Sequence, residues 1–298
     1  MVRRRHTARD IRPSERRTIM TAVRVRGLHK RYGDVVAVDG IDLDIQRGEV
    51  FGLLGPNGAG KTTTVEILEG YRGRDSGEVD VLGMDPGKAP NSWRDRIGVV
   101  WQSTADTPEL TVAEIIGNFA RYYRRPRDPG QVIEQVELTE QAGKRVHALS
   151  GGQRRRLDVA LGIIGDPDLL FLDEPTTGLD PEARRRFADL IRGLAAEGTT
   201  ILLTSHYLDE VETLAGRIAV IARGKIVAEG SPKTLGGRAT AVSTVQWVGE
   251  DGLHTIETDT PAKAVADLYA KSGEVSGLTV TRPTLEDVYL KLIGADDE

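Results

Sequence analysis

The amino-acid sequence predicts an α/β fold, in which helices cover a mainly parallel sheet and a smaller α+β unit follows. Three observations predict it. The glycine-rich loop GPNGAGKTT at 55–63 stands between an apolar run and a helical segment. Four apolar residues precede two acids in LLFLDEP at 169–175. Apolar strands then alternate with amphipathic helices to about residue 224, as they do in proteins with parallel sheets.

The segments before residue 70 predict strands and one helix. VRVRGL at 23–28 and IDLDI at 41–45 alternate apolar and polar residues, as half-buried strands do. EVFGLLG at 49–55 is the continuous apolar run of a buried parallel strand. GKTTTVEILEG at 60–70 has helical spacing and ends on a glycine. The glycine-rich loop therefore connects a strand to a helix.

The middle of the chain predicts a helical insert from about 102 to 165. Thr111 and Glu114 have the spacing of a capping box, and SGGQ begins the last helix of the insert. The three arginines at 154–156 fan around that helix, and we expect solvated or interdomain roles for them.

After the insert the strands resume, and a second unit follows them. Asp180 and Pro181 supply the cap and first turn of a long helix between two apolar strands. The first domain is expected to span 20–235. Glycine, serine and proline mark a linker at about 230–240, and a small α+β accessory domain is expected at 240–298.

Composition excludes several classes of protein. Of the 298 residues 39% are hydrophobic, which suffices for a core. The net charge is −5 with both signs interspersed, which argues against nucleic acid as the main partner. The chain has no cysteine, so disulfides and thiolate metal ligands are excluded. It has no run of about 18 apolar residues, the length that a membrane-spanning helix needs.

The first residues differ in character from the rest. Residues 1–19 are rich in arginine and lack apolar periodicity, so we expect a disordered basic tail. An arm that contacts anionic lipid is the alternative interpretation. The periodic pattern begins directly after Met20, which makes Met20 a candidate translation start.

The glycine-rich loop predicts a polyphosphate site. Its glycines let backbone N–H groups surround phosphate oxygens, Lys61 neutralises the β and γ phosphates, and the Thr62 hydroxyl can bind Mg²⁺. Asp173 and Glu174 follow a buried strand, which we expect beside the strand of the loop. There Asp173 would reach the metal, and Glu174 would orient or deprotonate a water. A pair of helix-capping acids is the alternative interpretation.

Together these motifs resemble the ATP-binding cassette of the ABC transporter family, over roughly residues 22–232. GPNGAGKTT resembles the family's Walker A motif, LLFLDEP its Walker B, LSGGQ at 149–153 its signature and TTGLD at 176–180 its D-loop. Gln102 resembles the Q-loop glutamine and His206 the switch histidine. The resemblance implies a P-loop NTPase with a RecA-like parallel core sheet, an antiparallel β subdomain and a helical subdomain that carries the signature.

The family assigns roles to the matching residues of this sequence. Catalytic roles are implied for Glu174, His206 and Gln102, and Mg²⁺ ligation for Thr62, Gln102 and Asp173. ATP is expected to contact Tyr32, as a ring on adenine, and the loop residues Gly55, Pro56, Asn57, Gly58, Ala59, Gly60, Lys61, Thr62 and Thr63. A second subunit's ATP is expected to contact Ser150, Gly151, Gly152, Gln153 and Asp180. For Tyr32, ordinary strand packing is the alternative.

The resemblance also implies a function. It predicts an ATP-hydrolysing homodimer that powers a separate integral membrane permease from the cytoplasmic face of the cell membrane. RPTLEDVYLKLIG and TSHYLDEVETLAGRIAVI resemble the drug and antibiotic-resistance exporters, so a drug, antibiotic or lipid-like substrate is expected. A soluble ABC ATPase acting on ribosomes or DNA is the alternative. The chain shows neither the second cassette nor the long coiled coil that such members carry.

Overall fold

The computed structural model describes residues 21–101, 109–205, 207–249 and 251–294. Four expectations concern residues outside these ranges and stay predictions. They are the basic tail at 1–19, the translation start at Met20, and the catalytic roles of Gln102 and His206.

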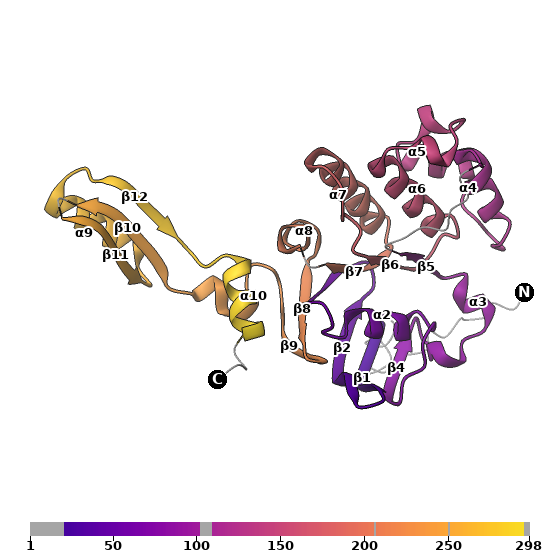
Figure 1. Ribbon diagram of the computed structural model, residues 1–298, viewed down its shortest axis with the longest axis horizontal. Coiled ribbons are helices and arrows are strands. Elements are labelled where there is room, and N and C mark those ends of the chain that lie inside the picture. Colours follow the sequence, from indigo (N-terminus) through magenta and orange to yellow (C-terminus); the bar gives the residue numbers. More distant parts are fainter. Residues whose placement is uncertain (1–20, 102–108, 206, 250, 295–298) are drawn as a thin grey trace, which may run out of the picture.

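The predicted α/β class is confirmed by a central six-stranded sheet with strand order β5-β6-β7-β3-β8-β9 (Figure 1). All neighbouring pairs in it are parallel except β8 and β9, which pair antiparallel. Its strands are β3 (Val50–Leu54), β5 (Ile97–Val100), β6 (Leu169–Asp173), β7 (Thr200–Ser205), β8 (Arg217–Ala222) and β9 (Lys225–Gly230).

The expected position of the LLFLDEP strand is wrong. We expected β6 beside β3, whereas β7 lies between them and pairs with both. All three strands are short apolar runs, so their sequences do not specify their neighbours in a parallel sheet. Because the three strands are parallel, the residues that follow them still emerge at one edge of the sheet.

A second, antiparallel sheet covers one face of the central sheet. It has the strand order β2-β1-β4, with β1 (Thr21–Tyr32), β2 (Val35–Gln46) and β4 (Ser76–Val81). Apolar side chains of this sheet share a core with α2 (Lys61–Leu68) and with one face of β3, β6, β7 and β8. Short helices η1 (Pro86–Lys88) and α3 (Asn91–Arg94) complete this side. The glycine-rich loop, which follows β3, therefore begins where the antiparallel sheet packs on the central sheet.

Helices cover the opposite face, in a larger apolar core (Figure 1). The predicted helical insert contains α4 (Val112–Ala120), α5 (Pro129–Gln135) and α6 (Gly151–Ile163), with η2 (Thr139–Gln141) and η3 (Val146–Ala148). The helices α7 (Pro181–Ala196) and α8 (Leu208–Leu214) follow. The capping box of Thr111 and Glu114 is confirmed at the start of α4, and the Asp180 cap is confirmed at the start of α7. Among the described residues, no helix is both long and apolar enough to span a bilayer.

The segment predicted as one accessory domain divides in the structure. Strands β10 (Ser243–Gly249), β11 (Gly252–Thr258) and β12 (Ser276–Thr281) form a sheet with α9 (Pro261–Ser272) on it, and this unit projects from the rest of the molecule (Figure 1). The last helix, α10 (Leu285–Gly294), instead packs on η4 (Leu235–Thr240), α8, β8 and β9.

Burial at α10 predicts the effect of a single substitution. Leu285 is 1% exposed and belongs to the same apolar core as Leu235 and α8. Leu285→Ala is expected to lower the free energy of unfolding by about 2–5 kcal/mol, because it leaves a cavity in that core. Val280→Ala, at an exposed position of β12, is the control and should change it by less than about 0.5 kcal/mol. Equal effects in urea titrations would contradict the assignment of α10 to this core.

Candidate functional site

The glycine-rich loop is pressed against neighbouring backbone, and this explains its glycines. A Cβ atom at Gly55 would lie 2.3 Å from the carbonyl oxygen of Ile221 in β8. At Gly60, where φ is 105°, it would lie 2.3 Å from the carbonyl oxygen of Ala37 in β2. Gly58 also has a positive φ, of 79°. The loop can therefore follow this path without strain only with glycine at these positions.

Lys61 begins α2 and is held against the loop. It is 7% exposed, and its ammonium donates to the carbonyl oxygens of Gly55, at 2.7 Å, and Pro56, at 3.1 Å. Burial lowers the pKa of Lys61, while the nearby carboxylates of Glu174 and Asp173 act in the opposite direction. A cation at the start of a helix, held beside a glycine-rich loop, is suited to binding a polyphosphate.

The end of β6 holds two acids in different conformations. An Asp173 carboxylate oxygen accepts from the Thr204 hydroxyl at 2.5 Å. The Glu174 backbone N–H donates to the carbonyl and hydroxyl oxygens of Thr204, both at 3.2 Å. Glu174 has a φ of 44°, a left-handed conformation that costs about 1–3 kcal/mol in a non-glycine residue and is concentrated at functional sites. Thr204 of β7 thus fixes the point where β6 ends.

The glycine-rich loop and the end of β6 meet at a cavity of about 350 Å³. Thr62 and Asp173 line it, together with Val65, Glu66, Glu69, Tyr71 and Trp101. The Thr62 hydroxyl and the Asp173 carboxylate supply oxygen atoms, the ligand type that Mg²⁺ prefers. No group of three or more histidines, aspartates or glutamates in the described part of the chain is arranged to hold a metal. Thr62 and Asp173 are of the chemical types that fit Mg²⁺, which commonly keeps water and substrate phosphate oxygens among its ligands.

The SGGQ segment lines a different cavity. Ser150 caps α6, its hydroxyl accepting from the Gln153 backbone N–H at 3.3 Å while the Gln153 side chain accepts from the Ser150 N–H at 3.0 Å. This cavity, of about 230 Å³, also includes Gly151, Gly152, Gly178, Leu179 and Asp180. It includes no residue of the loop cavity. Within one chain, the SGGQ residues and Thr62 thus line separate cavities.

Known proteins have sequences similar to this chain. A family model described as ABC transporter matches residues 38–177. The Nod factor export ATP-binding protein I of Ralstonia nicotianae is 40% identical, over 91% of this chain and 94% of that protein. The chain belongs to the ABC transporter family. As an ABC ATPase it binds ATP and hydrolyses it to power transport.

Two further comparisons agree with this family. A daunorubicin resistance ATP-binding protein of Streptomyces coeruleorubidus is 39% identical to this ABC ATPase, over 93% of this chain and 97% of that protein. Among solved structures, cbiO1 of Clostridium perfringens, described as part of the ABC transporter complex cbiONQ, is 28% identical with a TM-score of 0.67. The match covers 72% of this chain and 90% of the cbiO1 chain. The P-loop NTPase fold expected from the resemblance is confirmed.

Tyr32 ends β1 at the surface of the ABC ATPase. Its ring is partly exposed, with the Lys30 ammonium 5.5 Å and the Arg72 guanidinium carbon 5.3 Å from the ring centroid. Tyr32 pairs with Val35 across the turn that leads into β2, the strand that contacts the loop at Gly60. The ring is accessible to a base, and its contact with adenine stays a prediction.

The sequence allowed an interdomain role for the arginines at 154–156 but did not show that Arg155 has it. It is buried, and its guanidinium donates to the carbonyl oxygens of Pro175 at 2.7 Å, Trp101 at 2.6 Å and Asp173 at 2.9 Å. Arg155 therefore joins the signature helix α6 to the ends of β5 and β6, directly before Gln102 and beside Glu174. The pattern of three adjacent arginines carried no signal for this, because only the fold shows which of them turns inward.

Glu69 is a second residue that sequence reasoning missed. It is buried in the wall of the loop cavity, where its side chain hydrogen-bonds Trp101. Burial raises the pKa of Glu69 from 4.5 to about 7, with the Trp101 hydrogen bond opposing the shift. The ionised form is therefore less favourable in the folded protein than in the unfolded chain.

This shift predicts a pH dependence of stability. As the pH rises from about 4.5 through 7, the unfolded chain releases the Glu69 proton before the folded protein does, so the parent loses stability. Glu69→Gln stays neutral and should gain about 1–3 kcal/mol over the parent between pH 4.5 and pH 8. Unfolding free energies at both pH values test this, with Glu134→Gln at an exposed position of α5 as control. A gain that is the same at both pH values would rule out a raised pKa.

Proposed function

We propose that this chain is the ATPase of an exporter, acting as a homodimer on the cytoplasmic face of the cell membrane and powering a separate permease. The proposed cargo is a drug, an antibiotic or a lipid-like molecule. Relatives named for Nod factor export and for daunorubicin resistance, each matched over nearly its whole length, support export. Neither name supports the alternative of an ATPase that acts on ribosomes or DNA.

The observation that best supports a dimer is that the two cavities are separate within one chain. Thr62, which directly follows Lys61, and Ser150 of the same chain line cavities that share no residue. A second copy, facing the first, can supply the missing half. In this arrangement Ser150, Gly151, Gly152, Gln153 and Asp180 of each chain contact the ATP of the other.

The residues of each chain have distinct proposed roles. Lys61 and the loop N–H groups hold the β and γ phosphates, and Tyr32 contacts adenine. Thr62, Asp173 and Gln102 are the proposed Mg²⁺ ligands; the ion supplies positive charge to the transferred phosphoryl group. Glu174 orients or deprotonates the attacking water, and His206 is proposed to contact the γ-phosphate.

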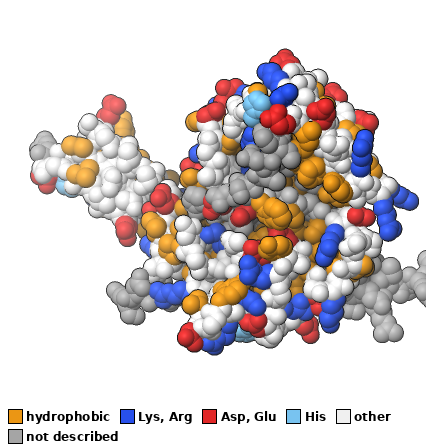
Figure 2. Space-filling view, turned by 45° about the vertical axis from the view of Figure 1, so that its right-hand side comes forward, with side chains coloured by type: hydrophobic (Ala, Val, Ile, Leu, Met, Phe, Trp, Pro, Cys, Tyr) orange, Lys and Arg blue, Asp and Glu red, His pale blue; other side chains and the backbone are white. Residues whose placement is uncertain are grey.

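An exposed aromatic pair is the proposed contact with the permease. Tyr71 is 72% and Trp101 58% exposed, with ring centroids 6.4 Å apart in an edge-to-face arrangement. Both line the cavity that Asp173 and Thr62 share, and Trp101 directly precedes Gln102. Figure 2 shows hydrophobic side chains gathered around the middle of the face it presents. Large exposed aromatic rings next to a nucleotide site are suited to anchoring a partner protein.

Purification of the tagged chain from detergent-solubilised membranes tests this proposal. We expect a strongly hydrophobic integral membrane protein to co-purify, and the double variant Tyr71→Ala, Trp101→Ala to lose it while still binding ATP. Leu290→Ala, at an exposed apolar position of α10, is the control and should retain it. Sedimentation with ribosomes or salt-sensitive retention on DNA, without a membrane protein, would contradict the proposal.

A further inference from the structure

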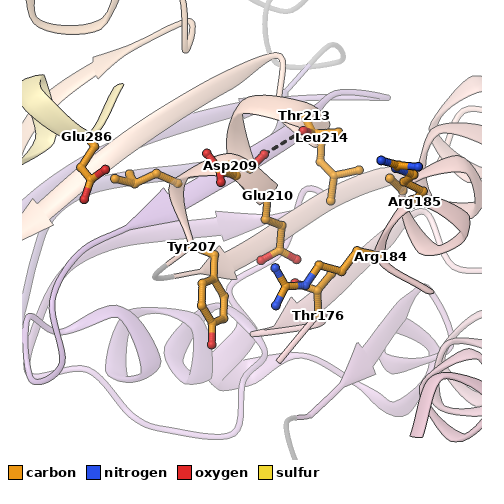
Figure 3. A pocket seen from close by; sticks show the side chains of 11 residues that line it. Thr176, Arg184, Arg185, Tyr207, Asp209, Glu210, Thr213, Leu214 and Glu286 are labelled. Carbon is orange, nitrogen blue, oxygen red and sulfur yellow. Dashed lines mark hydrogen bonds between the residues drawn. The ribbon is translucent and has the colours of Figure 1, made fainter. Parts of the chain in front are cut away.

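A third cavity, of about 370 Å³, lies between α7, α8 and the start of α10 (Figure 3). Its volume is in the range of cavities that hold small molecules in proteins. It shares no residue with the cavity that Thr62 lines or with the cavity of the SGGQ residues. It is therefore a candidate site of its own.

Two polar side-chain atoms in the lining of this third cavity are buried without a hydrogen-bond partner. They are Oγ1 of Thr176, a residue that is 2% exposed, and Oε1 of Glu210, a residue that is 9% exposed. The other carboxylate oxygen of Glu210, Oε2, accepts from the Ser205 hydroxyl, which limits rotation of the carboxylate. Buried polar atoms nearly always have a partner, so two such atoms in one cavity indicate a bound molecule that supplies the missing hydrogen bonds.

The chemistry of these two atoms defines the polar group of that molecule. An ionised carboxylate oxygen only accepts, whereas a threonine hydroxyl both donates and accepts. A hydroxyl group on the ligand satisfies both atoms, because it donates to Glu210 and accepts from Thr176. An ether oxygen does not, because it has no hydrogen to donate.

The walls of the third cavity carry charges of both signs. Arg184 and Arg185 of α7 line it, and so do Asp209 of α8 and Glu286 of α10. Figure 3 shows the Arg184 guanidinium close to the carboxylate of Glu210. Burial raises the pKa of Glu210, while the Ser205 hydroxyl and nearby arginines oppose this shift. The carboxylate thus already has positive charge beside it, and a neutral molecule fits these walls better than an anion or a cation does.

The remaining lining is mainly apolar. Ala188 of α7 and Leu214 of α8 are buried, and Leu208 and the ring of Tyr207 also line the cavity. Apolar walls with a few polar groups are typical of sites that bind small molecules. A compact apolar body lies against these side chains while its hydroxyl reaches the two unpartnered atoms.

We propose that the third cavity binds a neutral molecule with one hydroxyl group on a compact apolar or aromatic body. The ligand hydroxyl donates to Oε1 of Glu210 and accepts from the hydroxyl of Thr176. Because three helices line the cavity, the bound molecule adds contacts between α10 and the ATPase core. The site is independent of the proposed exporter function, since neither proposed nucleotide contact shares a residue with it.

Two probes that differ in one methyl group test this proposal on the full-length chain. They are para-cresol and its methyl ether, para-methylanisole, and only the first can donate a hydrogen bond. In titrations followed by protein NMR, para-cresol is expected to bind saturably, and the ether at least tenfold more weakly, because it leaves the Glu210 oxygen unpartnered. This comparison needs no variant, so it holds even where a substitution prevents folding.

A matched pair of substitutions places the binding in the third cavity. Thr176→Val removes the unpartnered hydroxyl at nearly constant volume and should weaken binding of para-cresol at least fivefold. Thr213→Val is the control and should change it by less than twofold, because the Thr213 hydroxyl lines the same cavity but already donates to the Asp209 carbonyl oxygen at 2.7 Å. Melting temperatures establish that both variants fold.

Three results would overturn the proposal. They are equal affinity for the two probes, parental affinity for para-cresol in folded Thr176→Val, and no saturable binding of either probe. The last result would show that water alone satisfies the two buried atoms.

Discussion

Saturable ATP binding should be lost in Lys61→Ala at nucleotide concentrations where the parent is fully bound. The ammonium is buried against the loop, so its removal leaves the phosphate charges facing backbone in a partly desolvated site. Truncating one partner of such a charge pair costs about 2–5 kcal/mol or more, roughly a factor of 30 to 5,000 in affinity. Titration with a fluorescent ATP analogue measures the change.

Lys88→Ala is the matched control for this substitution. Lys88 belongs to η1, at an exposed position outside the loop cavity, and its removal should leave the affinity within about twofold. Melting temperatures of both variants establish that they are folded. Parental affinity in folded Lys61→Ala would exclude the loop as the phosphate site.

Two kinds of mixed dimer should differ at least twofold in the amount of ATP that they trap. Both kinds carry the same two substitutions, on different chains in one kind and on the same chain in the other. In a Glu174→Gln background, which keeps shape and removes the base, one chain carries Lys61→Ala and the other Ser150→Arg. If ATP lies between chains, both lesions fall on one site, and the other site has an intact Lys61 and an intact Ser150. This dimer is expected to trap about one ATP, the count for one of two sites.

The reverse distribution provides the control. A chain that carries both substitutions, opposite a chain with neither, has one lesion in each site and should trap little ATP. Co-expression with two affinity tags yields both dimers, and Ser150→Thr, which keeps the cap of α6, tests whether the cap alone matters. More trapped ATP in the dimer with the doubly substituted chain would show that each site lies within one chain.

The parts of the fold that sequence predicted correctly depend on local chemistry. The capping box of Thr111 and Glu114 and the Asp180 cap formed because the hydrogen bonds in them join residues three apart. The glycine-rich loop follows β3 and precedes α2 because the apolar run, the glycines and the helical spacing are adjacent in sequence. Such features need no knowledge of distant contacts.

The parts that sequence did not predict depend on contacts between distant segments. The position of β7 between β3 and β6 was not predicted, because each of these apolar strands can pair with either of the others. The burial of Arg155 and Glu69 depends on partners that lie far away in the chain. Charged side chains are rarely buried. A charged residue in a sequence is therefore expected to be exposed unless its partners are known.

The accessory sheet begins and ends at one place on the ATPase. Arg238 of η4, which precedes the sheet, donates to the carbonyl oxygen of Pro283, which follows it, at 2.9 Å. The same guanidinium binds a carboxylate oxygen of Glu212 in α8 at 2.6 Å. The sheet is thus an insertion whose two ends already meet, and replacing it by a short turn should cost little closure entropy. Conversely, a displacement of the sheet would be transmitted to α8 through the contact between Arg238 and Glu212.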